Sequence, residues 1–192
     1  MTVTARTVEQ ALTGISRELE ALVAQTTADH ARALDDLASL IREAPRVFLL
    51  GAGRSGLALR MTAMRLMHLG LTAYVVGETT TPAIRRGDAL IAASGSGTTP
   101  AIVRAVSTAT EVGARVAAIT ASAQSPLAAA AEVVVVVPAA GKLDRSGEIS
   151  AQYAGSLFEQ AVLLLGDALF DALWHRSGTT ADELWPRHAN LE

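Results

Sequence analysis

The chain has 192 residues, of which 50% are hydrophobic but only 4% aromatic, and its formal net charge is −3. That length suits one domain, and a core rich in Ala, Val, Leu and Ile suits packed helices and buried parallel strands. The charge excludes a basic surface for nucleic acid, and the absence of cysteine excludes disulfides and thiolate chemistry.

The chain also lacks the features of a membrane protein. No stretch reaches the roughly 18 consecutive apolar residues of a membrane span, and the first 20 residues carry charges of both signs. The longest apolar run, residues 128–140, contains Glu132 and Pro138. We therefore expect no membrane association and a cytoplasmic location.

Two amphipathic helices are expected before the first strand. Apolar residues recur at spacings of three and four from Val8 to Val23, and a second helix is expected from about Asp29 to Arg42. Neither helix is needed to complete a βαβ unit. Their apolar stripes are therefore available for a partner subunit.

Five short apolar runs predict buried strands, and they cover residues 46–50, 72–76, 89–93, 116–120 and 133–137. Helices expected between strands make the sheet parallel, because parallel neighbours need crossover connections; the clearest of these helices are residues 57–69 and 100–111. The sequence thus predicts an α/β fold with a doubly wound five-stranded parallel sheet in the order 2-1-3-4-5 and helices on both faces.

The C-terminal part contains a polar loop after Pro138, a long apolar helix over residues 150–174 and a short tail. Nothing in the composition marks a second domain. We expect a single domain over residues 1–192, with N-terminal helices at 1–45, the α/β core at 46–178 and the tail at 179–192.

The segment Ser94–Thr99 (SGSGTT) follows a predicted strand and opens a helix, so it lies at a positive helix N-terminus. Gly95 and Gly97 allow the backbone to turn tightly around an anion. Short hydroxyl donors are provided by Ser94, Ser96 and Thr99. The pattern favours a phosphate site, with a simple Ser/Thr helix cap as the alternative.

The segment Gly51–Gly56 (GAGRSG) matches the GxGxxG spacing of a dinucleotide-binding turn, and Glu78 lies near the position of the ribose-binding acid. This spacing leaves a nicotinamide-dependent oxidoreductase open. However, two hydroxyl-bearing turns after strands one and three would face the same crevice. That pair fits one monophosphate better than a dinucleotide.

These two segments look like the phosphosugar-binding signature of sugar isomerase (SIS) domains, a flavodoxin-like fold. Four further segments resemble the 6-phospho-3-hexuloisomerase branch, namely MRLMHLG at 64–70, VGETTTPAI at 76–84, GSLFEQ at 155–160 and RHANLE at 187–192. The resemblance runs from the first strand to the last residue. One departure is Gln152-Tyr153-Ala154, which stands where the branch is expected to have Gln-Pro-Met.

The resemblance implies conversion of D-arabino-hex-3-ulose 6-phosphate to D-fructose 6-phosphate, in the ribulose monophosphate pathway of formaldehyde fixation. It implies Glu159 as the base that moves a proton through an enediol, with His188 assisting from a neighbouring subunit, and no metal or other cofactor. The phosphate-binding residues that it implies are Gly53, Arg54, Ser55, Ser94, Gly95, Ser96, Gly97, Thr98 and Thr99. It further implies a homo-oligomer, expected to be a tetramer, and functional coupling to a hexulose-phosphate synthase.

Without the resemblance, Glu159 could be a helix carboxylate stabilised by the macrodipole and His188 a surface histidine. Two other functions share the fold: arabinose 5-phosphate isomerisation and phosphosugar sensing without catalysis. A sensor needs an output module, and the roughly 45 residues before the first strand contain no basic recognition helix.

Other residues receive structural interpretations. His68, on an apolar helix, is expected to be a packing histidine. Three methionines recur every third residue, which indicates a core or subunit-packing stripe: Met61, Met64 and Met67. No group of His, Asp and Glu residues has the spacing of metal ligands.

Overall fold

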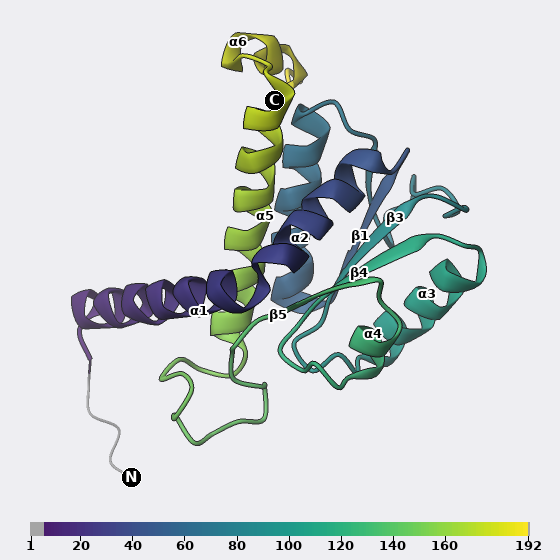
Figure 1. The fold of residues 1–192 in the computed structure, drawn as a ribbon. Coiled ribbons are helices and arrows are strands. Elements are labelled where there is room, and N and C mark those ends of the chain that lie inside the picture. The colour runs from purple at the N-terminus through teal and green to yellow at the C-terminus, as the bar shows by residue number, and fades with distance from the viewer. Residues whose placement is uncertain (1–5, 192) are drawn as a thin grey trace.

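The computed structural model describes residues 6–191, and its centre is a five-stranded parallel sheet in the order β2-β1-β3-β4-β5 (Figure 1). This confirms the predicted strand order and direction. In register, Leu49 lies opposite Val75 on one side and Ile91 on the other. The strands are β1 (Val47–Gly51), β2 (Ala73–Val75), β3 (Ala89–Ala93), β4 (Arg115–Thr120) and β5 (Val133–Val136).

Helices cover both faces of this sheet. The C-terminal half of α1 (Val8–Glu43), α2 (Gly53–His68) and α5 (Ser156–Ser177) share one hydrophobic cluster, whereas α3 (Pro100–Glu111) and α4 (Pro126–Ala129) share another. The chain ends in α6 (Ala181–Leu184) and the short 3₁₀ helix η1 (Trp185–Arg187). No helix within residues 6–191 is long and apolar enough to cross a membrane.

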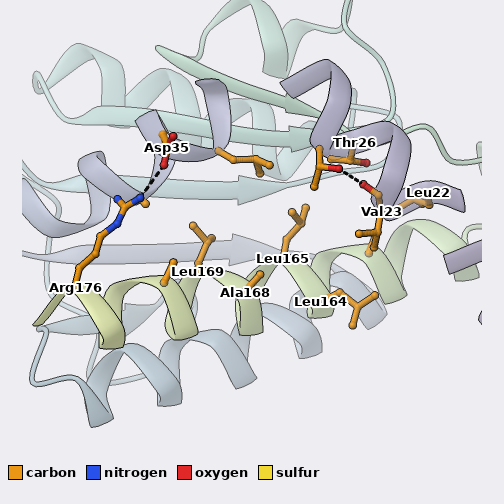
Figure 2. A pocket seen from close by; sticks show the side chains of 14 residues that line it. Leu22, Val23, Thr26, Asp35, Leu164, Leu165, Ala168, Leu169 and Arg176 are labelled. Atoms are coloured by element: carbon orange, nitrogen blue, oxygen red, sulfur yellow. Dashed lines mark hydrogen bonds and ion pairs between the residues drawn. The ribbon is translucent and has the colours of Figure 1, made fainter. Parts of the chain in front are cut away.

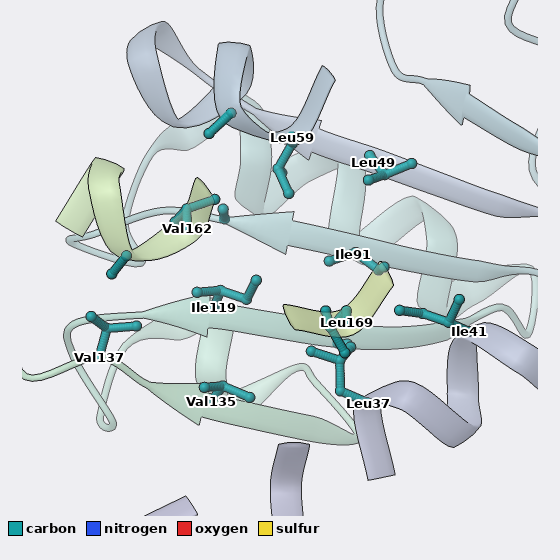
Figure 3. Close-up of a cluster of buried hydrophobic side chains, with 14 of the residues drawn as sticks. Leu37, Ile41, Leu49, Leu59, Ile91, Ile119, Val135, Val137, Val162 and Leu169 are labelled. Carbon is teal, nitrogen blue, oxygen red and sulfur yellow. The ribbon is translucent and has the colours of Figure 1, made fainter. Parts of the chain in front are cut away.

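The larger core lies between the sheet and the layer of α1, α2 and α5 (Figure 3). Leu49, Ile91 and Ile119 point into it from three neighbouring strands, and Leu37 meets them from α1. Phe48, between two residues of this core, belongs to the cluster on the opposite face. Both faces of the central strands β1, β3 and β4 are therefore buried, whereas the edge strands β2 and β5 are partly exposed. Burial on two faces explains why the central strands appear in the sequence as unbroken apolar runs.

The two predicted N-terminal helices lie within α1 and meet at a kink at His30, where the backbone is not helical (φ −130°, ψ 20°). Upstream of the bend the Thr27 hydroxyl donates to the carbonyl oxygens of Val23 and Ala24, at 2.9 and 3.0 Å. Such back-bonding commonly bends helices. The segment before the bend, residues 8–29, is called the N-terminal arm below, and its far end projects away from the sheet (Figure 1).

The long apolar helix begins later than predicted, at Ser156 rather than near Ser150. Residues 138–155 form an irregular loop, called the crevice loop below. Ala154 has a φ of +51°, which is incompatible with a right-handed helix and stops α5 from extending toward Ser150.

Candidate active site

The two glycine-containing turns meet at the carboxyl ends of β1 and β3, as expected for a ligand crevice in a doubly wound sheet. A cavity of about 60 Å³ lies between them. It is lined by Ala52, Ser55, Ala93, Ser94, Gly95, Ser96, Thr99, Ile102 and Lys142. Five of the expected phosphate-binding residues thus share one cavity, whereas Gly53, Arg54, Gly97 and Thr98 are not among the lining residues.

Three helix N-termini around this crevice lack a side-chain cap. The cap residues Ala52 of α2, Thr99 of α3 and Gly155 of α5 make no side-chain hydrogen bond to the first turn. By contrast, the other α-helices, α1, α4 and α6, are capped by the side chains of Thr7, Ser125 and Thr180. The first-turn N–H groups of α2, α3 and α5 are therefore left available for an anion.

The Ser94–Thr99 loop is held by its own hydroxyls rather than by a helix cap. Ser94 Oγ and Thr99 Oγ1 are hydrogen bonded at 2.9 Å, so the Thr99 hydroxyl is directed away from the first turn of α3. Thr98 donates to Ser96 Oγ from both its backbone N–H and its hydroxyl. The cap that sequence reasoning kept as the alternative is thus absent at Thr99.

Gly97 is required by the shape of this loop. Its φ of +62° lies in the left-handed region, and a Cβ at this position would collide with the Ser125 side chain. Ser125 cannot easily give way, because its hydroxyl donates to the Ser122 carbonyl and accepts from Ala128 N–H at the start of α4. Gly97 therefore shapes the loop from behind the crevice.

Gly51 and Gly56 explain the dinucleotide-like spacing of the other turn. A Cβ on Gly56 would lie 2.6 Å from the Gly51 carbonyl oxygen, so the start of α2 packs directly on the end of β1. Ser55, between them in space, is buried at 6% exposure and lines the cavity. The glycines thus permit a close approach of the backbone that needs no nucleotide.

Glu159 lies in the first turn of α5, at the same end of the sheet. Its carboxylate forms a 2.6 Å ion pair with Arg54 Nε at the start of α2. The Glu159 side chain is 12% exposed, whereas that of Arg54 is 66% exposed. Phe158 next to it packs on Gly95. Sequence reasoning did not predict this ion pair.

His188 lies elsewhere in the chain. Its ring stacks on His68 at a centroid distance of 4.1 Å and contacts Trp185 at 4.7 Å, while Arg187 donates to the His68 carbonyl oxygen. His68 ends α2 and Ser55 lies in its first turn, and 13 residues at 1.5 Å each separate them by about 20 Å. The structure does not bring His188 and Glu159 of one chain together.

His68 is buried at 4% exposure, as expected of a packing histidine. Its Nδ1 has no hydrogen-bond partner in the part of the chain that the structure describes. Burial, with the nearby His188 and Arg65, lowers the pKa of His68 below its usual value. This imidazole is therefore held in its neutral form at neutral pH.

Sequence reasoning missed Lys142, which the crevice loop brings to the edge of the cavity. Lys142 is the only lysine in the chain. Its position in a polar loop after the last strand, at the carboxyl edge of the sheet, was the available signal. No cluster of three or more His, Cys, Asp or Glu side chains placed to hold a metal ion occurs among residues 6–191.

Comparison with known proteins places these features in context. The SIS domain family model matches residues 40–152. The chain is 54% identical over 176 residues to the 3-hexulose-6-phosphate isomerase of Mycobacterium gastri, covering 89% of this chain and 88% of the relative. It is 38% identical to the 3-hexulose-6-phosphate isomerase of Bacillus subtilis, covering 82% and 86%.

A solved structure is also similar. It is a hypothetical protein from Methanococcus jannaschii for which the function of 3-hexulose-6-phosphate isomerase was inferred. It superimposes with a TM-score of 0.82 at 31% identity, covering 95% of this chain and 99% of that one.

Proposed function

The chain belongs to the SIS domain family and, within it, to the 3-hexulose-6-phosphate isomerases; from this we propose that its crevice converts D-arabino-hex-3-ulose 6-phosphate to D-fructose 6-phosphate. It is an isomerase of the ribulose monophosphate pathway. The single observation that carries the assignment is the 54% identity that extends over most of both chains. The site geometry supplies the physical account.

The phosphate of the substrate is held between α2 and α3. Backbone N–H groups at two uncapped helix N-termini and the hydroxyls of Ser55, Ser94 and Ser96 suit a phosphate, because they donate hydrogen bonds from several directions. With its phosphate fixed there, the sugar chain extends toward the first turn of α5.

Glu159 is the base in this proposal. Its carboxylate removes the proton from C2 of the 3-hexulose, which gives an enediolate across C2 and C3. The proton is then delivered to C3, while a proton passes from the C2 hydroxyl to the C3 oxygen, so that the carbonyl group moves from C3 to C2. Arg54, which is largely exposed, can turn from Glu159 toward the substrate oxygens, where its positive charge stabilises the enediolate.

His188 acts from a neighbouring subunit in this proposal, because about 20 Å of α2 separates it from its own crevice. We propose a closed homo-oligomer, a tetramer by family resemblance, with the N-terminal helix and the C-terminal tail at the contacts. Two features support such contacts: the half-exposed Met61, Met64 and Met67 on α2, and an apolar groove between α1 and α5.

Figure 2 shows this groove, which has a volume of about 240 Å³ and is crossed at one end by the ion pair between Arg176 and Asp35. Leu164, Leu165 and Ala168 of α5 face Val23 of the N-terminal arm across it. An apolar groove of this kind is the shape that a helix from a second copy fills.

We also propose that the enzyme works in the cytoplasm beside a hexulose-phosphate synthase. The substrate is a product of formaldehyde condensation with ribulose 5-phosphate, so a synthase must supply it. Coupling here means shared metabolic flux and requires no physical contact.

The assay that tests this function supplies ribulose 5-phosphate, formaldehyde and a separate synthase, and measures D-fructose 6-phosphate. Formation of the product only when the chain is present supports the proposal. Ribulose 5-phosphate alone is the comparison substrate, because turnover to arabinose 5-phosphate without formaldehyde would favour the other isomerase. Binding of hexulose phosphate without turnover would favour a sensor.

The phosphate site is tested with Ser96→Ala. Ser96 lines the cavity and is exposed, so its loss should spare the fold while removing one donor to the phosphate. We expect KM to rise about 5- to 10-fold, the loss of one hydrogen bond to a charged group. An unchanged KM together with unchanged inhibition by inorganic phosphate would contradict the assignment.

A further inference from the structure

The crevice contains little positive charge of its own. Its hydroxyls and helix N-termini carry partial charges, and Arg54 pairs with Glu159 and, in the proposed function, serves the sugar oxygens rather than the phosphate. A phosphate monoester is close to a dianion at neutral pH. A cation that is free to approach the anion is therefore the group that this site still needs.

Lys142 is that cation. It lines the cavity together with Ser55, Ser94 and Ser96, although it comes from the loop that follows β5, the strand at one edge of the sheet. Its ammonium forms no ion pair or hydrogen bond within residues 6–191. Its stem lies over the N-terminus of α5, since a Cβ on Gly155 would come within 3.3 Å of Lys142 Cγ.

The crevice loop is fixed by a residue from a distant part of the sequence. The Glu18 carboxylate, on the N-terminal arm, accepts hydrogen bonds from Ser150 Oγ at 2.6 Å, Ala151 N–H at 2.9 Å and Gln152 Nε2 at 3.1 Å. These bonds outweigh partial burial and lower the pKa of Glu18, so the carboxylate is ionised at neutral pH. Because the three donors belong to consecutive residues and bind one carboxylate, they fix the position of the loop.

The same contacts continue to the proposed base. The Gln152 side chain, held by Glu18, accepts a 2.9 Å hydrogen bond from Gln160 Nε2, and Gln160 is the neighbour of Glu159 on α5. A single carboxylate on the N-terminal arm therefore supports both the loop that carries Lys142 and the first turn of the helix that carries Glu159.

We infer that Lys142 is a substrate-binding residue that contacts the phosphate group, and that Glu18 is a positioning residue that holds the crevice loop so that Lys142 can do so. The inference rests on the proposed function. It adds one ligand contact from the crevice loop and one positioning contact from the N-terminal arm.

The first experiment uses the fact that the chain has one lysine. Reductive methylation with ¹³C-formaldehyde keeps the positive charge of Lys142 and gives it a single NMR signal, distinct from that of the N-terminal amine. Titration with inorganic phosphate should shift this signal in a saturable way. A Lys142 signal that does not respond, while the chain binds phosphate, would overturn the inference.

Steady-state kinetics of Lys142 variants provide a second test of the phosphate contact. Lys142→Ala should raise KM and the inhibition constant of inorganic phosphate about 10-fold, as expected for one lost charge-assisted contact, and Lys142→Arg should recover most of it. Arg145→Ala is the matched control, because it removes the same charge from the same loop away from the cavity. Equal effects of the two alanine variants would show a general charge effect and overturn the inference.

The positioning role of Glu18 is tested by proteolysis at a single peptide bond. A lysine-specific protease can cut this chain only after Lys142, so its rate reports how often the loop opens. Glu18→Ala should speed cleavage about 10-fold or more and raise KM more than it lowers kcat, and saturating phosphate should slow cleavage of the wild type. Glu20→Ala, on the exposed side of the same helix, is the control and should change neither.

Glu18→Gln, which keeps one acceptor oxygen, should lie between the alanine variant and the wild type. Cleavage and KM of Glu18→Ala at wild-type values would overturn the positioning role. Failure of the proposed function is distinguishable: a wild type without turnover whose Lys142 signal still responds to phosphate loses the isomerase assignment and keeps the phosphate contact.

Discussion

The two ends of α2 show how one helix serves two different purposes. At its N-terminus the first-turn N–H groups are uncapped, Arg54 is exposed and the backbone faces a cavity. At its C-terminus His68 is buried under His188, and Arg187 donates to the His68 carbonyl oxygen. One end is left open for a ligand, and the other is closed by the tail of the same chain.

This difference matters for catalysis, because sequence resemblance assigns Glu159 and His188 to one active site. Within one chain they lie near opposite ends of α2. An active site that uses both must therefore combine the open end of one subunit with the closed end of another. The predictions below test this division of roles.

The largest effect is expected at the open end. Glu159→Gln keeps the size of the side chain and removes the base, so kcat should fall about 10²-fold or more while KM changes little. Asp167→Asn, on the exposed side of the same helix, is the control and should retain full turnover. A Glu159→Gln enzyme that assembles normally and keeps near wild-type kcat would reduce Glu159 to a helix carboxylate.

Mixed subunits test whether the two ends cooperate. Glu159→Gln and His188→Ala oligomers are prepared separately and then allowed to exchange subunits, which is monitored by native mass spectrometry. Hybrids contain some sites with both residues intact, so activity should rise about 10-fold above either parent. Complete exchange without recovered activity would remove His188 from a neighbouring site.

A third prediction concerns the loop at the open end. Gly97→Ala combines a left-handed φ with a collision against Ser125 and should cost about 2 to 4 kcal/mol of unfolding free energy. Gly53→Ala has a similar φ of +57° but free space around it and should cost only about 1 kcal/mol. Urea denaturation of both variants measures the difference, and equal costs would show that the Ser125 contact is unimportant.

The smallest effect is expected at the closed end, where folding stability should depend on pH. The pKa of His68 is lowered in the folded chain, so the unfolded chain binds a proton at a higher pH. The stability contributed by neutral His68 is complete above the ordinary pKa of about 6.5 and is lost as pH falls through the lower folded value. Arg65, Arg187 and His188 around it add positive charge that opposes protonation.

Thermal melts between pH 8 and pH 5 measure this loss. His68→Leu, which cannot titrate, should lose less stability than the wild type over that range. In a Trp174→Phe background, Trp185 fluorescence should report the tail separately, because Trp185 contacts His188 directly. An identical decrease in the two proteins would assign the pH dependence to other groups.

The sheet could be predicted from the sequence because its strands are apolar throughout and the central strands β1, β3 and β4 are buried on both faces. β3 occupies the predicted residues 89–93, and the limits of the other strands differ from the predicted ones by at most one residue. The physical reason is that burial on two faces leaves continuous apolar runs, which glycine and proline then delimit. The parallel direction followed from the crossover helices, and the strand order followed from the doubly wound fold type.

The features that sequence reasoning missed depend on contacts between distant residues. The late start of α5 reflects the crevice loop, which is held by Glu18 more than 130 residues away. The Arg54–Glu159 ion pair joins two helices, and no local pattern predicts it. The three methionines on α2 are 41–49% exposed, so they do not belong to the core of this chain. The other interpretation, packing against a second subunit, stays a prediction.

The bend in α1 has a mechanical consequence. Glu18 lies 12 residues before His30, which at 1.5 Å per residue makes a lever of about 18 Å, and a rotation of about 5° at the bend would move Glu18 by roughly 1.6 Å. Because the crevice loop is hydrogen bonded to Glu18, the same displacement would also move Lys142. The contacts that restrain the N-terminal arm therefore help to set the width of the crevice. Their loss would change the position of Lys142 before it affected the sheet.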